Sequence, residues 1–259
     1  MAYNNIVFER EGPLAIITIN RPPVNALNVD TVKELAAALD EIKADAAARV
    51  VIITGAGQHS FIAGADINQF TTMDQTSGAE VIQYAQSVFS SLETYPKPVI
   101  AAINGVCLGG GNELAMCCDL RIAAESARFG QPEINLGIIP GWGGTQRLAR
   151  LVGRGRALEV LLTGDMVKAS DALRIGLVNR VVPDGELMAQ TKNLARKLSM
   201  QAPLAMAAIK RAVTEGADGT LAEGLAVELK EFMQILLTED AGEGIMAFLG
   251  KRRPQFKGA

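Results

Sequence analysis

The chain has 259 residues, with 25 lysines and arginines against 28 aspartates and glutamates, and its formal net charge is only -3. This balance excludes the strongly basic surface of a nucleic-acid-binding protein or of a protein attracted to anionic membranes. The N-terminal segment lacks the basic and apolar regions of a signal peptide, and no apolar run is long enough to span a bilayer. We therefore expect one large domain, alone or with an appendage, in a cytoplasmic protein or a matrix form without its presequence.

The first part of the chain alternates between strand and helix patterns. Segments 14–19 (LAIITI) and 49–55 (RVVIITG) are short, rich in β-branched residues and bounded by Gly, Pro or charge, so each is predicted as a strand. Segment 29–45 between them is predicted as a helix. Its apolar face consists of Val32, Leu35, Ala36, Leu39 and Ile42. A strand–helix–strand start is typical of an α/β protein.

The later part of the chain changes from strands to helices. Segments 97–109 and 120–130 each predict a further strand, and 176–182 predicts a last one. From about Ser170 onward helix patterns dominate. The longest apolar stripe in this region consists of Leu221, Leu225, Leu229, Phe232 and Leu236. The C-terminal third is therefore predicted to be a layer of helices.

Several familiar catalytic and cofactor motifs are missing. In LGGGNEL, Leu114 occupies the place of the third small residue of a dinucleotide fingerprint, and no phosphate-binding loop, nucleophile elbow or zinc motif occurs. The only histidine, His59, lies in a turn-rich loop, where we expect a surface residue. Cys107, Cys117 and Cys118 form no C-x-x-C pair and are predicted to be reduced thiols of the core. We expect no metal and no cofactor.

Two glycine-containing segments remain as candidates for function. If a strand ends near Gly105 and a helix starts near Gly110, the first N–H groups of that helix are free, and glycines leave the backbone accessible. Segment 60–67 (SFIAGADI) offers a second accessible backbone around Gly64. Two N–H groups from two such segments can hold one oxygen that gains negative charge, which is an oxyanion hole.

Two carboxylates accompany these segments. Glu113 falls in the first turn of the predicted helix, and Glu133 follows Pro132, before another glycine-rich loop that opens a helix. Two carboxylates beside an oxyanion hole suit proton transfers next to a carbonyl, one managing a water and the other the carbon-bound proton. A glutamate in a first helical turn is also a favourable partner of the helix dipole, and a glutamate after proline is often a cap or a surface group.

Five blocks of the sequence resemble the enoyl-CoA hydratase (crotonase) family, in the family's order and over essentially the whole chain. They are FIAGADI (61–67), KPVIAAINGVCLGGGNELAMCCDLRIA (97–123), FGQPEINLGIIPGWGGTQRL (129–148), LTGD (162–165) and EGIMAFLGKRRPQF (243–256). The resemblance implies an α/β fold, a crotonase-like spiral of ββα units over residues 1–195, followed by a C-terminal helical region over 196–259 that packs at a trimer interface. Trimers of the family often pair into hexamers, so we expect a homotrimer or homohexamer.

The resemblance also implies roles for individual residues. The backbone N–H groups of Ala65 and Gly110 would hold the thioester oxygen of an acyl-CoA, which is the expected substrate. Glu113 would activate a water, and Glu133 would supply the proton that arrives at the α-carbon. The implied substrate-binding residues are Ala63, Ala65, Asp66, Ile67, Gly110, Pro140 and Gly141. The implied reaction is hydration of a trans-2-enoyl-CoA, which in reverse dehydrates a 3-hydroxyacyl-CoA.

Two other functions exist on this fold. Relatives move double bonds or carry out other acyl-CoA reactions, usually with other acid and base residues, and one branch binds RNA. The presence of both glutamates favours hydration. The acidic balance of the chain argues against nucleic acid.

Some positions depart from the family or carry two interpretations. Asn68 and Pro23 stand where hydratases often carry lysines near the CoA phosphates, so Arg21, Lys251 or Arg252 are candidate substitutes. Segment 68–90 is expected to cover the acyl pocket. Trp142 either shapes that pocket or packs against the C-terminal helices.

Overall fold

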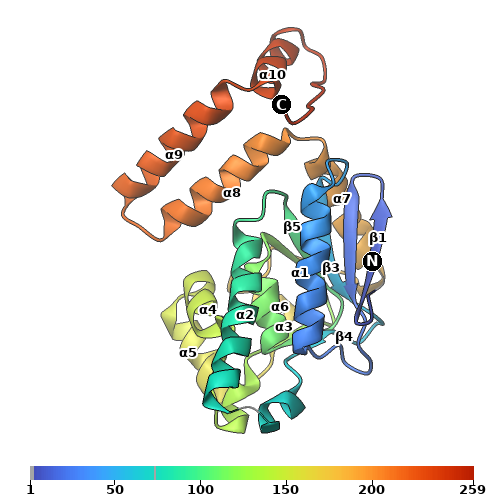
Figure 1. The fold of residues 1–259 in the computed structure, drawn as a ribbon, viewed down its shortest axis with the longest axis vertical. Coiled ribbons are helices and arrows are strands. Elements are labelled where there is room, and N and C mark those ends of the chain that lie inside the picture. The colour runs from blue at the N-terminus through green and yellow to red at the C-terminus, as the bar shows by residue number, and fades with distance from the viewer. Residues whose placement is uncertain (1–2, 73) are drawn as a thin grey trace.

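The computed structural model describes residues 3–72 and 74–259, and in these ranges strands and helices alternate until β10, after which only helices follow (Figure 1). The strands are β1 (Ile6–Glu11), β2 (Leu14–Ile19), β3 (Val50–Gly55), β4 (Ser60–Ala63), β5 (Val99–Ile103), β6 (Val106–Leu108), β7 (Leu120–Ala124), β8 (Arg128–Gly130), β9 (Val167–Lys168) and β10 (Arg180–Val182). The helices are α1 (Val29–Ala44), α2 (Gln75–Glu93), α3 (Gly110–Cys117), α4 (Gly144–Val152), α5 (Arg154–Thr163), α6 (Ala169–Arg174), α7 (Leu187–Ser199), α8 (Pro203–Ala217), α9 (Leu221–Leu236) and α10 (Glu239–Leu249). Short 3-10 helices are η1 (Ile67–Thr72), η2 (Pro132–Leu136) and η3 (Asp184–Glu186).

Two sheets share the strands in a regular way. The larger sheet has the order β1-β2-β3-β5-β7-β10, and the smaller has the order β4-β6-β8-β9. The pairs β3/β4, β5/β6 and β7/β8 each place their first strand in the larger sheet and their second in the smaller, and a helix follows each pair. The chain therefore winds through repeated ββα units. This is the predicted α/β spiral, and it brings the carboxyl ends of β4, β6 and β8 to one edge.

The strand predictions need four corrections. Segment 97–109 is not one strand but two, β5 and β6, which lie in different sheets. The break lies at Gly105, where a Cβ atom would come within 2.2 Å of the carbonyl oxygen of His59, so the chain can turn there only without a side chain. Segment 120–130 likewise divides into β7 and β8, and β1, which pairs antiparallel with β2, was not predicted. In 176–182 only residues 180–182 form the strand β10.

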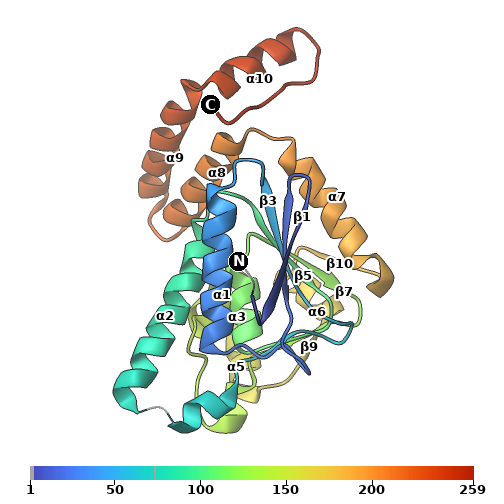
Figure 2. The ribbon, with the colours of Figure 1, turned by 45° about the vertical axis from the view of Figure 1, so that its right-hand side comes forward.

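The core lies on both faces of the larger sheet. One face packs against α7, and β2, β3, β5 and β7 supply its buried aliphatic side chains. The other face looks toward the smaller sheet and helices α1, α2 and α3, which together enclose the main core (Figure 2). On α1 the predicted apolar face is buried at Val32, Leu35, Leu39 and Ile42, whereas Ala36 is only half-buried.

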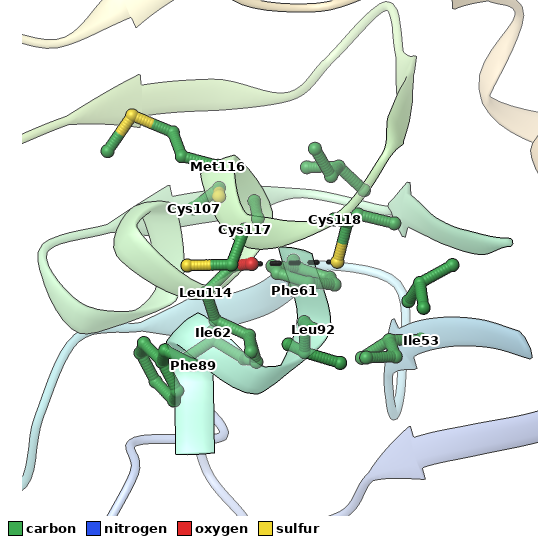
Figure 3. Close-up of a cluster of buried hydrophobic side chains, with 14 of the residues drawn as sticks. Ile53, Phe61, Ile62, Phe89, Leu92, Cys107, Leu114, Met116, Cys117 and Cys118 are labelled. Atoms are coloured by element: carbon green, nitrogen blue, oxygen red, sulfur yellow. Dashed lines mark hydrogen bonds between the residues drawn. The ribbon is translucent and has the colours of Figure 1, made fainter. Parts of the chain in front are cut away.

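Helix α3 runs through the middle of this core, and all of its residues are buried. Leu114 and Met116 pack among Phe61, Ile62 and Phe89, with the three cysteines around them (Figure 3). Cys107, Cys117 and Cys118 are free thiols, and burial raises the pKa of each, so the prediction of reduced core thiols is confirmed. A helix this rigidly enclosed fixes the residues at its first turn.

Helices α8, α9 and α10 extend away from the body, and α8 and α9 lie side by side (Figures 1 and 2). The predicted helical layer is therefore confirmed. Its expected beginning at 195–196 falls inside α7, which packs on the sheet as a whole. The division of the chain into a core over 1–195 and a helical region over 196–259 stays a prediction. Within the described ranges, no helix combines the length and the apolar character needed to cross a bilayer.

Candidate active site

A cavity of about 890 Å³ opens at the edge where β4, β6 and β8 end. Its walls come from four parts of the chain: residues 63–67, the start of α3, the segment 132–146 and helix α2. Most of the residues singled out from the sequence line it, namely Ala63, Ala65, Ile67, Gly110, Glu113, Glu133, Pro140, Gly141 and Trp142. Ile82 and Gln86 of α2 also line it, so the segment 68–90 does border the cavity, although Met73 lies outside the described residues.

The first turn of α3 presents free backbone N–H groups. The N-cap residue Gly109 has φ +49° and gives no side-chain cap, and the first helical hydrogen bond runs from the N–H of Glu113 to the carbonyl of Gly109. The N–H of Gly110 therefore has no partner inside the helix. The described part of the chain supplies no other acceptor for it.

The N–H of Ala65 is free for a different reason. Leu27 forms a parallel bridge to Ala65, in which Leu27 donates to the carbonyl of Gly64 and accepts from the N–H of Asp66. In such a bridge the middle residue directs its own N–H to the opposite side. Ala63 and Leu108 form the last pair of the β4–β6 ladder, and both Ala65 and Gly110 line the cavity just beyond this pair. Their two N–H groups are therefore the candidate donors of an oxyanion hole.

The glycines of α3 serve internal packing as well as access. A Cβ atom on Gly110 would come within 2.3 Å of the indole ring of Trp142, and one on Gly111 within 2.2 Å of the carbonyl oxygen of Ile62. A Cβ atom on Gly109 would meet Glu133 Oε1 at 2.7 Å. The run GGG is therefore also required because the protein's own atoms occupy the space beside it.

Glu113 lies in the first turn of α3, as predicted, and its side chain is almost fully buried, with 2% of the residue exposed. Its Oε1 accepts hydrogen bonds from the N–H groups of Trp142 at 2.8 Å and Gly144 at 2.7 Å. Burial raises its pKa to about 7, repulsion by Glu133 adds to the rise, and the two backbone donors oppose it. A carboxyl group with this pKa can act as a base at neutral pH.

Glu133 lies in η2 on the opposite wall of the cavity. Burial raises its pKa as well. The amide of Gln131, which is fully buried, donates to both carboxylate oxygens at 3.2 Å when its nitrogen faces Glu133. Gln131 was not singled out from the sequence, although its position two residues before Glu133, on the same extended entry to η2, was available as a signal.

Trp142 lines the cavity, and its indole packs edge-to-face on Phe89 of α2 with ring centroids 5.5 Å apart. The alternative that it packs against the C-terminal helices is wrong. The reason is that the loop 140–143 folds back over the start of α3, so the ring covers Gly110. Trp142 thus contributes to the cavity wall beside Gly110.

The other polar residues singled out from the sequence lie outside the cavity wall. Asp66 is not among the lining residues; its carboxylate accepts from Arg21 at 2.5 Å and from the amide of Asn68 at 3.0 Å. Arg252 pairs with Glu243 on α10. Lys251, with φ +49°, follows α10 and is exposed. None of the three candidate cations, Arg21, Lys251 and Arg252, lines the cavity itself.

His59 is exposed in the turn before β4, so the prediction of a surface histidine is confirmed. Among residues 3–72 and 74–259, no three His, Cys, Asp or Glu side chains gather in a way that could hold a metal ion. The titratable groups that meet at the cavity are the two glutamates.

Comparison with known proteins agrees with this architecture. The family model described as enoyl-CoA hydratase/isomerase matches residues 9–259. The chain belongs to this family. The short-chain-enoyl-CoA hydratase of Clostridium acetobutylicum is 48% identical over 254 residues, which cover 98% of this chain and 97% of that protein. The crotonyl-CoA hydratase of Syntrophomonas wolfei is 47% identical over 257 residues, which cover 99% of this chain and 99% of that protein.

Solved structures of the enoyl-CoA hydratase/isomerase family superpose closely. An enoyl-CoA hydratase from Bacillus anthracis has a TM-score of 0.95 and 40% sequence identity, with 99% of this chain and 100% of that chain covered. An enoyl-CoA hydratase subunit from Geobacillus kaustophilus has a TM-score of 0.94 at 43% identity, with 99% of each chain covered. The predicted family and fold are thereby confirmed.

Proposed function

We propose that the protein adds water across the double bond of a trans-2-enoyl-CoA and so forms a 3-hydroxyacyl-CoA. The observation that carries the proposal is the meeting, in one cavity, of the buried carboxyl group of Glu113, the half-buried carboxyl group of Glu133 and two free backbone N–H groups. The names of the two bacterial relatives above support the same substrate class. No covalent nucleophile is needed, because water is the nucleophile.

The reaction uses each group once. Glu113 holds the water and takes one of its protons as the oxygen attacks the β-carbon. The electron pair of the double bond moves toward the thioester, and the N–H groups of Ala65 and Gly110 hold the oxygen that becomes negative. Glu133 then delivers its proton to the α-carbon. One C–O bond and one C–H bond form while one π bond is lost, so atoms and electrons balance.

The pKa values of the two glutamates bear on the proton's path. Both are raised by burial, and that of Glu113 reaches about 7. Hydration ends with the proton on Glu113, whose raised pKa favours the protonated form. The proton must therefore return to Glu133 before the next turnover, through solvent or a bound water.

The test is a direct assay of the purified protein with crotonyl-CoA. We expect loss of the conjugated enoyl absorbance without added metal or nicotinamide, and an NMR spectrum of the product with a hydroxyl group on the β-carbon. A product in which the double bond has moved would instead identify an isomerase. A panel of enoyl-CoA thioesters of increasing chain length, with one aromatic and one alicyclic member, then defines the acyl preference.

The cellular setting and the assembly belong to the same proposal. We infer a homotrimer or homohexamer, supported by the apolar residues exposed on α8, α9 and α10. A cytoplasmic location is supported by three cysteines that remain free thiols. Neither nucleic acid nor a membrane surface is expected as a partner, given the formal net charge of -3.

A further inference from the structure

The loop that holds Glu113 is itself held from the outside by a single arginine. Arg147, in the first turns of α4, donates from Nη1 to the carbonyl oxygen of Trp142 at 2.9 Å. The same guanidinium donates to both carboxylate oxygens of Glu93 on α2, at 2.8 and 3.0 Å, and to the hydroxyl of Ser90 at 2.9 Å. Its side chain is 15% exposed, so the contacts form in a largely desolvated place.

The position of this carbonyl is informative. The N–H of Trp142 and the N–H of Gly144 both point at Glu113 Oε1, and the carbonyl of Trp142 lies between them along the chain. Arg147 Nη1 donates to that carbonyl. The peptide between Trp142 and Gly143 therefore cannot rotate without breaking a hydrogen bond to a charged group.

The fit of the guanidinium is tight. Gly143 has φ +111°, and a Cβ atom there would come within 1.9 Å of Arg147 Nη1. A guanidinium presents several donors in a planar fork, which allows it to bind a carboxylate at two points and a carbonyl at a third. The ammonium group of a lysine cannot reproduce this set of contacts.

We propose that Arg147 is a positioning residue of the hydration reaction: anchored to α2 by Glu93, it fixes the Trp142 carbonyl and thereby keeps the two loop N–H groups directed at Glu113. The inference rests on the proposed function, since Glu113 acts there as the base. Arg147 does not line the cavity, so it affects turnover through the position of the loop and not through contact with the substrate.

Charge adds a second effect that can be measured separately. The charged and titratable groups that act on Glu113 are Glu133 from η2, which raises its pKa, and Arg147 from α4, which lowers it. Cys117, one turn further along α3, also faces it and is a thiol. Glu93 on α2 is tied to Arg147. Removing the charge of Arg147 therefore raises the pKa of Glu113 beyond the rise that loss of the loop N–H donors causes, whereas lysine keeps the charge and leaves only the effect of the donors.

The experiment compares Arg147→Lys, which keeps the charge but not the fork, with Arg147→Met, which keeps neither. With crotonyl-CoA we expect both to lower kcat by about tenfold to a hundredfold, the range for losing a hydrogen bond to a charged group, while KM changes less than about threefold. The acid limb of kcat/KM, where Glu113 becomes protonated, should move to higher pH in both variants, because both loosen the N–H donors, and further in Arg147→Met, which also loses the charge.

A second measurement does not depend on activity. Trp142 is the only tryptophan of the chain, so its fluorescence reports on the loop directly. We expect red-shifted emission and stronger acrylamide quenching in both variants, at temperatures where circular dichroism shows a folded protein. The matched control is Arg150→Lys on the same helix, whose exposed ion pair with Asp218 does not involve the loop. It should behave as wild type in every measurement.

The inference is overturned if folded Arg147→Lys keeps wild-type kcat, if only KM changes, or if the indole emission is unaltered. It is also overturned if kcat falls only in proportion to the folded fraction. A wild-type protein that hydrates no enoyl-CoA would instead refute the proposed function, and the fluorescence measurement would still test whether Arg147 holds the loop.

Discussion

At the scale of single residues, the balance of forces on Glu113 decides the chemistry of the site. Two backbone donors stabilise its ionised form, yet burial of a 2%-exposed residue is the largest influence on its pKa, which rises to about 7. Without the donors the group would remain protonated at neutral pH; without burial it would be too weak a base. The loop amides thus lower the pKa of Glu113 and burial in the core around α3 raises it, and the balance of the two effects places it near neutral pH.

The first prediction concerns the two carboxyl groups. Glu113→Gln and Glu133→Gln keep the shape of the side chain but remove a proton carrier, so each should lower kcat by about a hundredfold or more while acyl-CoA still binds. Steady-state kinetics and calorimetric binding of a non-reactive acyl-CoA separate the two effects. The double variant should lose far less than the product of the single losses, because both groups serve one water and one proton path. A single variant with near-normal kcat would show that its glutamate is only structural.

The second prediction concerns stability. The pKa of Glu113 rises from 4.5 to about 7 on folding, so the folded state binds its proton more tightly, and the free energy of unfolding falls as pH rises through this range. Glu113→Gln removes this pH-dependent loss of unfolding free energy, because glutamine does not titrate. Relative to wild type, the variant should therefore gain about 3 kcal/mol between about pH 4.5 and pH 8. Thermal unfolding at both pH values measures the difference. Glu80→Gln, at an exposed position of α2, is the control and should show no such gain.

At the scale of secondary structure, helix α3 shows why a buried helix begins with three glycines. Gly109 adopts φ +49°, Gly110 lies under the indole of Trp142, and Gly111 faces the carbonyl of Ile62. Each glycine is therefore required for a different reason: Gly109 by the backbone turn, Gly110 by the loop 140–143 and Gly111 by strand β4. The open N–H groups of the first turn are a consequence of the same arrangement.

The third prediction tests this packing. Gly110→Ala keeps the N–H group but places a methyl group 2.3 Å from the indole ring, so the ring or the helix start must move. Misalignment of one oxyanion donor should lower kcat by about a hundredfold, and the emission of Trp142 should shift. Gly155→Ala in α5 is the matched control, since a Cβ atom there meets nothing within 4 Å. An active Gly110→Ala enzyme with unchanged emission would contradict the role given to this glycine.

At the scale of the whole molecule, the C-terminal helices carry apolar side chains that the chain itself does not cover. Leu221, Leu229 and Phe232 on α9 are 80%, 62% and 59% exposed, and Phe248 on α10 is 83% exposed. Helices α8 to α10 extend away from the body (Figure 2), and these side chains remain largely exposed to solvent. An exposed apolar surface of this kind is typical of an interaction site.

The fourth prediction is that the protein forms a trimer or a hexamer at micromolar concentration, measured by light scattering after size exclusion. Replacing Leu229 and Phe232 together by glutamate should release smaller species, because buried charges would face the partner. Lys33→Glu on α1 adds the same charge at an exposed position and should leave the mass unchanged. A monomeric wild-type protein would contradict the prediction.

Much of the architecture was accessible from local patterns. Strands β2 and β3, helix α1 and the start of α3 follow from β-branched runs, an apolar stripe and a glycine turn, because these patterns act over a few neighbouring residues. Glu113 and Glu133 were paired from the residues alone, and the family resemblance then added a separate role for each. The division of 97–109 into β5 and β6 escaped, because the steric cause at Gly105 is a carbonyl of His59, remote in sequence.

What the amino-acid sequence by itself determined is the set of parts: glycines that leave N–H groups free, two glutamates in helical turns, and a tryptophan in a glycine-rich loop with an arginine just after it. Only the tertiary structure decided how they act. It buried Glu113 and raised its pKa, directed the N–H groups of the loop at its carboxylate, and laid Trp142 over Gly110 rather than on the C-terminal helices. The physical reason is that desolvation and hydrogen-bond direction depend on atoms contributed by segments distant along the chain, and local periodicity carries no information about them.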